Sequence, residues 1–429
     1  MEYNINEELN EDDILPKKPG SYPKSAKIII IVLSIIVFLL ILTIILAIAL
    51  KKDDSKDKDN SNQKEEKPFD LISFYRTAFG GEILYNQTYA EGEVENTFRK
   101  GGANHKDLIG DINDNKNYTA TKYNIYDLYL PYTALQEKKT KGIIVFIHGG
   151  AWFQGSKEEM TYLAQIYYEK EFIVINLDYT LITEEDNTTN LYRQLDEISA
   201  CINHVKNYLV SRGFKESELQ VAVSGGSAGG HLSLLYGYLV NNPPLEVKFI
   251  NDCIGPVNLD IDDYLLIQND NDTLPDIEPK TVEEALKHRE KYVQPMVNDV
   301  VILKFLNYFV GCKYTNELQS MLKDGKIDKN NEKYKELYDK AKYGFPINWM
   351  EGKNIPIFAF YGGKDRLIGF VQFSRLREAA NKYGNTLEIV YSRYGDHALS
   401  EFDHKEGIKA AKDFHYTMLK FSDKYFTKY

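Results

Sequence analysis

The sequence has 429 residues, 43% of them hydrophobic, and a formal net charge of −11 at pH 7. A chain of this length accommodates one large α/β domain with appendages, and its apolar content is enough for a substantial core. Because the acidic balance offers no basic face to a phosphate backbone, no nucleic-acid partner is expected.

The N-terminal region contains a segment long enough to cross a bilayer. Residues 28–50 form a predominantly apolar stretch of 23 residues flanked on both sides by lysines, whereas the apolar region of a secretory signal has about 7–15 residues. We therefore expect a polar tail over residues 1–27, a transmembrane helix over 28–50 and a solvated stalk over 51–67, which contains no apolar residue and mixes charges of both signs. The folded domain is expected to span residues 68–429.

Two signals bear on the side of the membrane that the folded domain occupies. The stalk carries slightly more lysines than the tail, which opposes an exterior location, although acidic residues lie among them. N-glycosylation sequons favour the exterior or lumenal side, and they begin at Asn86, Asn117, Asn187 and Asn271. We expect a single-pass membrane protein with an exterior or lumenal domain.

The cysteines are odd in number and lack the spacing of a metal site. Cys201, Cys253 and Cys312 are compatible with one disulfide and one thiol, or with three buried thiols. The sequence leaves both arrangements open.

Short apolar, β-branched strands alternate with helical segments from about residue 120 onward. Strands of this composition suit a sheet covered on both faces, and their alternation with helices predicts a mostly parallel sheet. Residues 262–350 interrupt the alternation with charged, helical sequence, which predicts a helical cap inserted into the domain. The strands are predicted over residues 123–130, 142–147, 172–179, 219–224, 248–254, 355–361 and 386–392.

The sequence SGGSAGG, residues 224–230, places four glycines around Ser227. Glycine permits close backbone approach and positive φ, so the turn is sterically tight. Residues 225–229 also fit the pattern G-x-S-x-G, with a predicted strand before and an apolar helix after, which is the context of a nucleophile elbow. A turn that only packs a helix against a strand would have the same sequence pattern. A catalytic role for Ser227 therefore depends on whether the chain also supplies oxyanion donors, a base and an orienting acid.

A glycine loop supplies the donors that an oxyanion needs. The sequence HGGAW, residues 148–152, directly follows a predicted strand, and a loop in this place can direct backbone N–H groups at a substrate carbonyl. His148 is expected to be structural. The candidate donors are Gly149, Gly150, Ala151 and, just after the nucleophile, Ala228.

The nucleophile, the acid and the base follow one another in that order in this architecture, each after a strand. Asp365 follows the predicted strand 355–361, and His397 follows the predicted strand 386–392. We therefore predict Ser227, Asp365 and His397 as a catalytic triad, in which the aspartate orients the histidine and the histidine activates the serine.

Other titratable residues fit these roles less well. His404 begins a charged helical segment, and His231 is held on the helix that follows Ser227. Asp396 adjoins the predicted base and cannot easily reach its far nitrogen.

Together these motifs resemble a known enzyme family. From about residue 120 to its end, the chain is similar to the α/β-hydrolase esterases of the hormone-sensitive-lipase-like group, which include acetyl-, feruloyl- and other carboxylesterases and kynurenine formamidase relatives. Two residues depart from the pattern: many relatives have Asp at the position of Gly226 and Gly at the position of Ala151. The resemblance therefore assigns the chain to no particular subfamily. The matching sequences are YDLYLP (126–131), HGGAW (148–152), NLDYTL (176–181), GGSAGGHLS (225–233), GGKD (362–365) and GDHAL (395–399).

The predicted triad and the resemblance imply a membrane-anchored serine hydrolase that cleaves carboxylic esters through an acyl-enzyme. A small-molecule ester and water are the expected substrates, and no metal or organic cofactor is needed. The same triad would serve an amidase or formamidase. A catalytically silent hydrolase-like binding or adhesion module is the alternative outside enzymes, although such modules commonly lose a triad member and all are present here. We expect the cap, residues 262–350, to determine the acyl and alcohol preference.

Overall fold

The computed structural model describes residues 80–89, 120–183, 189–260, 266–268, 281–285, 293–295, 299–312, 314–363, 365, 367–392, 395–397 and 405–426. All of these residues belong to one compact unit, Asp70–Tyr429. Among them, no helix combines the length and the apolar character needed to cross a membrane. The predicted tail, transmembrane segment and stalk, residues 1–67, lie outside the described residues.

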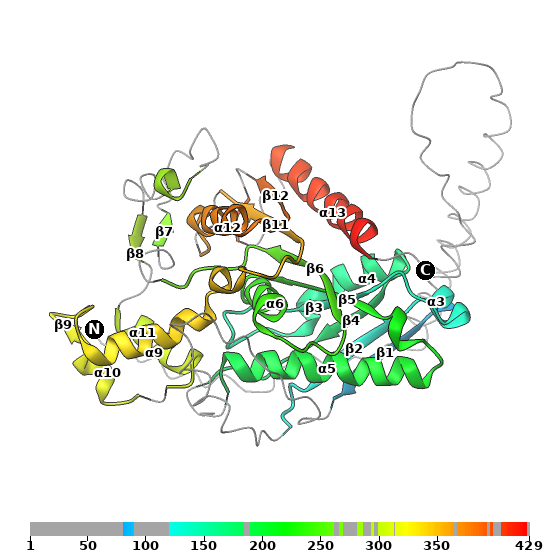
Figure 1. The fold of residues 1–429 in the computed structure, drawn as a ribbon, viewed down its shortest axis with the longest axis horizontal. Coiled ribbons are helices and arrows are strands. Elements are labelled where there is room, and N and C mark those ends of the chain that lie inside the picture. Colours follow the sequence, from blue (N-terminus) through cyan, green and yellow to red (C-terminus); the bar gives the residue numbers. More distant parts are fainter. Residues whose placement is uncertain are drawn as a thin grey trace, which may run out of the picture. The chain divides into compact units, whose positions relative to one another are not determined.

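Eight strands form the central sheet in the order β1-β2-β4-β3-β5-β6-β11-β12 (Figure 1). Neighbouring strands from β4 to β12 pair in parallel, whereas β2 pairs antiparallel with β1 and β4. The mostly parallel α/β sheet predicted from the sequence is confirmed. The strands are β1 (Glu82–Thr88), β2 (Ile125–Leu130), β3 (Ile143–Ile147), β4 (Ile173–Leu177), β5 (Gln220–Gly226), β6 (Glu246–Cys253), β11 (Ile357–Gly362) and β12 (Leu387–Ser392).

Each of the seven predicted strands corresponds to one strand of this sheet. The edge strand β1 has no predicted counterpart, because its sequence EILYNQT is half-buried or exposed throughout and contains no sustained apolar run. The three cysteines are free thiols, as in the second arrangement that the sequence leaves open, but only Cys201 is buried, whereas Cys253 and Cys312 are half-buried.

Helices cover both faces of the sheet. The helix α4 (Thr161–Glu169) and the helix α13 (Lys405–Tyr425) cover one face, and α5 (Leu191–Ser211), α6 (Ala228–Leu239) and α12 (Phe370–Tyr383) cover the other (Figure 1). Each strand supplies both cores, since successive side chains alternate between faces. In β3, Ile143, Val145 and Ile147 join the α5 and α6 core, while Ile144 and Phe146 join the α4 and α13 core.

Smaller elements complete the connections. A short helix, α3 (Tyr132–Glu137), follows β2, and two 3₁₀ helices, η3 (Lys157–Met160) and η4 (Glu216–Glu218), precede α4 and β5. Asn190 caps the long helix α5, and its side chain accepts hydrogen bonds from the N–H groups of Tyr192 and Arg193 in the first turn.

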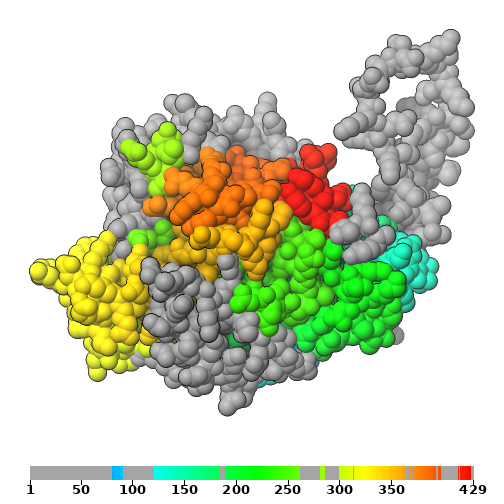
Figure 2. Space-filling model, viewed as in Figure 1, coloured from blue at the N-terminus to red at the C-terminus, as the bar shows by residue number. Residues whose placement is uncertain are grey.

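The insertion over residues 262–350 is largely helical where the structure describes it. Beside α6, the Phe309 ring lies 5.6 Å from the His231 ring, and the rings of Phe305 and Phe309 contact Trp152 at centroid distances of 5.3 and 5.0 Å, the first tilted and the second edge-on. Figure 2 shows the yellow surface of α9 (Asp299–Phe309) to α11 (Glu332–Ala341) well apart from the red surface of α13, with the orange region of α12 between them. The elements are β7 (Leu266–Gln268), β8 (Val293–Pro295), α9 (Asp299–Phe309), α10 (Glu317–Ser320), β9 (Leu322–Lys323), β10 (Lys326–Ile327), α11 (Glu332–Ala341), η5 (Lys342–Gly344) and η6 (Pro346–Trp349).

Candidate active site

Ser227 occupies a strained turn between β5 and α6. Its backbone adopts φ 55° and ψ −121°, a conformation that is costly for a residue with a side chain. Two backbone hydrogen bonds hold it: the Ser227 N–H donates to the Cys253 carbonyl at 2.8 Å, and the His231 N–H donates to the Ser227 carbonyl at 3.0 Å. The strand, turn and helix therefore present the serine hydroxyl at the carboxyl edge of the sheet.

The glycines beside Ser227 are required by close backbone approach. A Cβ atom at Gly225 would lie 2.3 Å from the carbonyl carbon of Gly229, and a Cβ atom at Gly229 would lie 2.0 Å from the carbonyl oxygen of Ile147. No side chain fits at such distances. The absence of side chains lets α6 approach both β5 and the end of β3, where the glycine loop begins.

The three residues predicted as a triad lie within hydrogen-bonding distance of one another. The His397 Nε2 atom is 3.1 Å from the Ser227 Oγ atom, and the His397 Nδ1 atom is 2.8 Å from the Asp365 Oδ2 atom. The other carboxylate oxygen, Oδ1, accepts hydrogen bonds from the N–H groups of Leu367 and Ile368, both at 2.8 Å. The carboxylate is therefore fixed with one oxygen facing the imidazole, which is the arrangement that orients a general base.

The glycine loop holds three consecutive residues at positive φ: Gly150 at 100°, Ala151 at 49° and Trp152 at 68°. The Gly150 carbonyl accepts from the N–H groups of residues 153 and 154, which closes the turn. The N–H groups of Gly150, Ala151 and Ala228 donate no hydrogen bond to any residue that the structure describes. Gly149, Gly150 and Ala151 line the same cavity as Ser227, so these donors are available to a developing oxyanion.

His148 supports the loop from the protein interior. Its buried ring stacks on Tyr179 with a centroid distance of 4.2 Å, and its Nδ1 atom donates to the Gly149 carbonyl at 2.7 Å. The Tyr179 hydroxyl donates to the His148 carbonyl at 3.0 Å. Burial lowers the pKa of His148 to about 4, so the ring is neutral at physiological pH.

His231, a rejected candidate for the base, links three parts of the domain. Its Nδ1 atom accepts from the Trp152 Nε1–H at 3.2 Å, and its Nε2 atom lies 2.7 Å from the Gly344 carbonyl, to which it donates. Burial lowers the pKa of His231 to about 3, which keeps one nitrogen free to accept. The residue connects α6, the glycine loop and the end of the insertion, a role that no sequence motif indicated.

A buried carboxyl lies behind the elbow at the end of β6. The Asp252 Oδ2 atom is 2.6 Å from the Tyr361 hydroxyl oxygen, which is also 2.7 Å from the Gly255 carbonyl. A hydroxyl has one hydrogen and two acceptors face it here, so the contacts are satisfied when Asp252 carries a proton and donates it to Tyr361. Burial raises the pKa of Asp252 to about 7, in agreement with this count.

The cavity above Ser227 has a volume of about 780 Å³. It lies against the α4 and α13 face of the sheet, and its lining includes Leu163, Phe414 and His397. No described residue of 262–350 lines it. The part of the insertion that the structure describes therefore does not line the site, and the expectation that residues 262–350 form a cap that determines the substrate preference stays a prediction. The helical periodicity of a segment does not tell which face of the sheet it joins.

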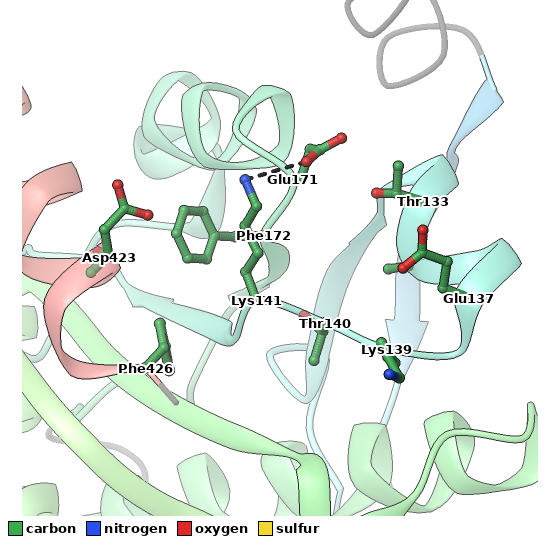
Figure 3. Close-up of a pocket in the computed structure, with 11 residues that line it drawn as sticks. Thr133, Glu137, Lys139, Thr140, Lys141, Glu171, Phe172, Asp423 and Phe426 are labelled. Carbon is green, nitrogen blue, oxygen red and sulfur yellow. Dashed lines mark ion pairs between the residues drawn. The ribbon is translucent and has the colours of Figure 1, made fainter. Parts of the chain in front are cut away.

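A second pocket, of about 460 Å³, lies at the opposite edge of the sheet (Figure 3). Lys141 and Glu171, which precede β3 and β4, form an ion pair of 3.3 Å across it. It contains none of the predicted catalytic residues. Within the described ranges, no cluster of three or more His, Cys, Asp or Glu residues could hold a metal ion.

Comparison with known proteins points to one family. The family model described as BD-FAE matches residues 126–380. Among solved structures, a truncated carbohydrate esterase from gut microbiota is 17% identical with a TM-score of 0.49, and the match covers 78% of this chain and 95% of that chain. Esterase B from Lactobacillus rhamnosis is 14% identical with a TM-score of 0.45, covering 82% and 91%. Esterase 2 of Thermogutta terrifontis is 15% identical with a TM-score of 0.43, covering 69% and 88%. No curated protein shows a significant match.

Proposed function

Because the chain belongs to the BD-FAE family (bifunctional acetyl/feruloyl esterases) and is thereby a carboxylic ester hydrolase, we propose that it cleaves its ester through an acyl-enzyme formed on Ser227. The observation that carries the proposal is the pair of contacts at His397, 3.1 Å to the serine hydroxyl and 2.8 Å to the Asp365 carboxylate. A serine hydroxyl is a weak nucleophile at neutral pH and needs a base at this distance.

The proposed reaction proceeds in two halves. His397 takes the hydroxyl proton as Ser227 attacks the ester carbonyl, and the N–H groups of Gly150, Ala151 and Ala228 stabilise the oxyanion. His397 then gives the proton to the departing alcohol, which leaves the acyl group on Ser227. In the second half, water loses a proton to His397, attacks the acyl-enzyme and releases the acid. The Asp365 carboxylate holds the imidazole and stabilises its positive charge throughout.

The substrates follow from the family. The family's name refers to two acyl groups, acetyl and feruloyl, and we propose that this chain hydrolyses esters of these acyl groups.

Labelling of the nucleophile tests the proposal. A fluorophosphonate should modify Ser227 with one equivalent per chain and abolish hydrolysis of 4-nitrophenyl acetate in proportion, because it mimics the tetrahedral intermediate. Ser227→Ala should take up no label. Ser233→Ala is the matched control, since the Ser233 hydroxyl is buried and donates to the Gly229 carbonyl at 2.8 Å. Label on Ser224 or Ser233, or no label with an active protein, would contradict the proposal.

The proposed membrane anchor rests on sequence alone. Residues 28–50 have the length and apolar character of a spanning helix, and we propose that they tether the hydrolase domain on the exterior or lumenal side. The full chain should then stay with membranes through a carbonate wash. Protease added to sealed vesicles should reach the domain or the 27-residue leader, but not both, and which one is digested gives the orientation.

A further inference from the structure

The floor of the cavity contains a polar pair on neighbouring strands. Ser224 of β5 and Asn251 of β6 are paired in register, both line the cavity, and their side chains are 4% and 2% exposed. The flanking Ala222 and Phe249 belong to the core beneath α4 and α13, and side chains two residues apart lie on the same face. The pair therefore lies on the cavity face of the sheet.

The Asn251 amide has no hydrogen-bond partner among the described residues. Neither Oδ1 nor Nδ2 makes a hydrogen bond with any residue that the structure describes. An amide that is buried without partners costs free energy, and native proteins tolerate few of them. Because this amide lines a cavity next to the candidate nucleophile, a group that enters the cavity can supply the missing bonds.

The walls around this floor are apolar. Met160, Phe414 and Met418 are each at most 9% exposed and line the cavity, together with the half-buried Leu163. Apart from the candidate catalytic residues Ser227 and His397, the other charged or amide side chains that line the cavity are Gln154 and Glu159, and both are exposed. A ligand group that reaches the floor must therefore pass apolar walls and end in a hydrogen-bonding atom.

The floor lies within reach of a group attached to Ser227. The Ser227 N–H donates to the Cys253 carbonyl at 2.8 Å, and Asn251 precedes Cys253 by two residues, which is roughly 7 Å along a strand. The acyl group stays bonded to Ser227 after the alcohol departs, so a buried cavity suits the acyl half of the ester. The alcohol must leave past His397, whose side chain is 25% exposed.

We infer that Asn251, with Ser224 beside it, is the specificity-determining floor of the acyl pocket, and that the pocket selects acyl groups with an apolar body and a hydrogen-bonding group at the far end. This inference rests on the proposed acyl-enzyme at Ser227. The Asn251 carboxamide would accept from and donate to the distal group, such as a phenolic hydroxyl, and the Ser224 hydroxyl would supply a further contact.

A pair of substrates with a common leaving group tests the inference on the full-length protein. We compare kcat/KM for the 4-nitrophenyl esters of 3-(4-hydroxyphenyl)propanoic acid and 3-phenylpropanoic acid, which differ by one distal hydroxyl. Wild type should prefer the hydroxylated ester. In Asn251→Leu the preference ratio should fall about three- to tenfold, the size of one neutral hydrogen bond, and in Ser224→Ala it should fall less.

The stability of the variants separates a binding role from a structural one. Asn251→Leu removes an unpartnered amide, so its resistance to denaturant should equal or exceed that of wild type. The matched control is Asn307→Leu: Asn307 is fully buried, and its amide exchanges two hydrogen bonds of 2.8 Å with the Tyr314 backbone. That variant should be destabilised and keep the wild-type preference ratio.

Several outcomes would overturn the inference. These are a ratio unchanged in Asn251→Leu, a wild type without preference for the hydroxyl, a preference seen only when the hydroxyl is on the alcohol half, and an Asn251→Leu protein markedly less stable than wild type. Failure of the proposed function is distinct from these outcomes: wild type would then hydrolyse neither ester, and fluorophosphonate would not label Ser227.

Discussion

Asn251 and Asp252 are neighbours in β6, but their side chains lie on opposite faces of the sheet in different surroundings. Asp252 faces α6, where its Oδ1 atom accepts from the Gly255 N–H at 2.9 Å and its Oδ2 atom contacts the Tyr361 hydroxyl. Asn251 faces the cavity beneath α4 and α13 with both polar atoms unpartnered among the described residues. Both are almost fully buried. The difference indicates that the Asp252 side chain serves the stability of the fold, whereas the Asn251 amide is available to a ligand.

The candidate catalytic groups belong to neither face. Ser227, Asp365 and His397 follow β5, β11 and β12 at the carboxyl edge that both faces share. Substitutions at the edge should therefore lower kcat. Substitutions at the cavity should alter the preference between acyl groups, and substitutions on the α6 face should alter the free energy of unfolding.

The largest effect is expected at the edge. Ser227→Ala removes the nucleophile and should lower kcat by roughly 10⁴- to 10⁶-fold without unfolding the protein, with the remaining rate supplied by the oxyanion donors and substrate binding. His397→Ala should be nearly as severe. Because the two residues act as one unit, the double variant should be no slower than the worse single variant, as steady-state kinetics with 4-nitrophenyl acetate will show. Additive losses would mean that they act separately.

The next effect concerns the orientation of the base. In Asp365→Asn the amide oxygen should keep the hydrogen bonds from Leu367 and Ile368, which turns the NH₂ group toward His397 Nδ1. That contact favours the tautomer with hydrogen on Nε2, which cannot accept the serine proton, so kcat should fall by up to about 10⁴-fold. The variant should still fold like wild type by circular dichroism. A kcat within tenfold of wild type would exclude Asp365 as the orienting acid.

The candidate triad could be predicted from the sequence because chain order and local motifs specify it. A strand followed by a glycine-rich turn around Ser227, and later strands followed by Asp365 and His397, leave few other arrangements at a parallel sheet edge. The seven strands were predictable for a similar reason, since buried parallel strands are short apolar runs.

The cavity floor could not be predicted in this way. Asn251 lies in the predicted strand 248–254 like any other residue, and the cavity that it lines is also lined by Phe414 and Met418, which are more than 160 residues away in the sequence. The location of the insertion is a second example. Its charged helical sequence predicts helices, but the contacts of Phe305 and Phe309 with Trp152 decide that it packs beside α6.

A smaller effect is expected on the α6 face, where Asp252 makes stability depend on pH. Burial raises its pKa from 3.8 to about 7, so the folded state binds a proton that the unfolded state has lost. The free energy of unfolding should therefore fall as the pH rises from 3.8 to about 7, by at most about 1.4 kcal/mol per pH unit from this group. Asp252→Asn mimics the protonated form, since its NH₂ group can donate to Tyr361 as the carboxylic acid does.

Denaturant unfolding across pH tests this expectation. Asp252→Asn should match wild type near pH 4 and become increasingly more stable than wild type up to about pH 7. The pKa of Asp178 is also raised by burial, to about 6, but Asp178 is present in both proteins, so its contribution cancels in the difference. A constant difference between the two proteins across this range would show that Asp252 is not protonated in the fold.

The smallest effect is expected in the insertion. Asn331 caps α11, and its side-chain oxygen accepts from the N–H groups of Lys333 and Tyr334 at 2.9 and 3.2 Å. Asn331→Ala should cost about 1 kcal/mol in the free energy of unfolding, while Asn330→Ala, at an exposed neighbour, should cost nothing measurable. Neither change should alter the preference between the hydroxylated and plain esters, because no described residue of 262–350 lines the cavity. If Asn331→Ala shifted that preference, the insertion would be coupled to acyl binding, and the sheet face beneath α4 and α13 could not be its sole determinant.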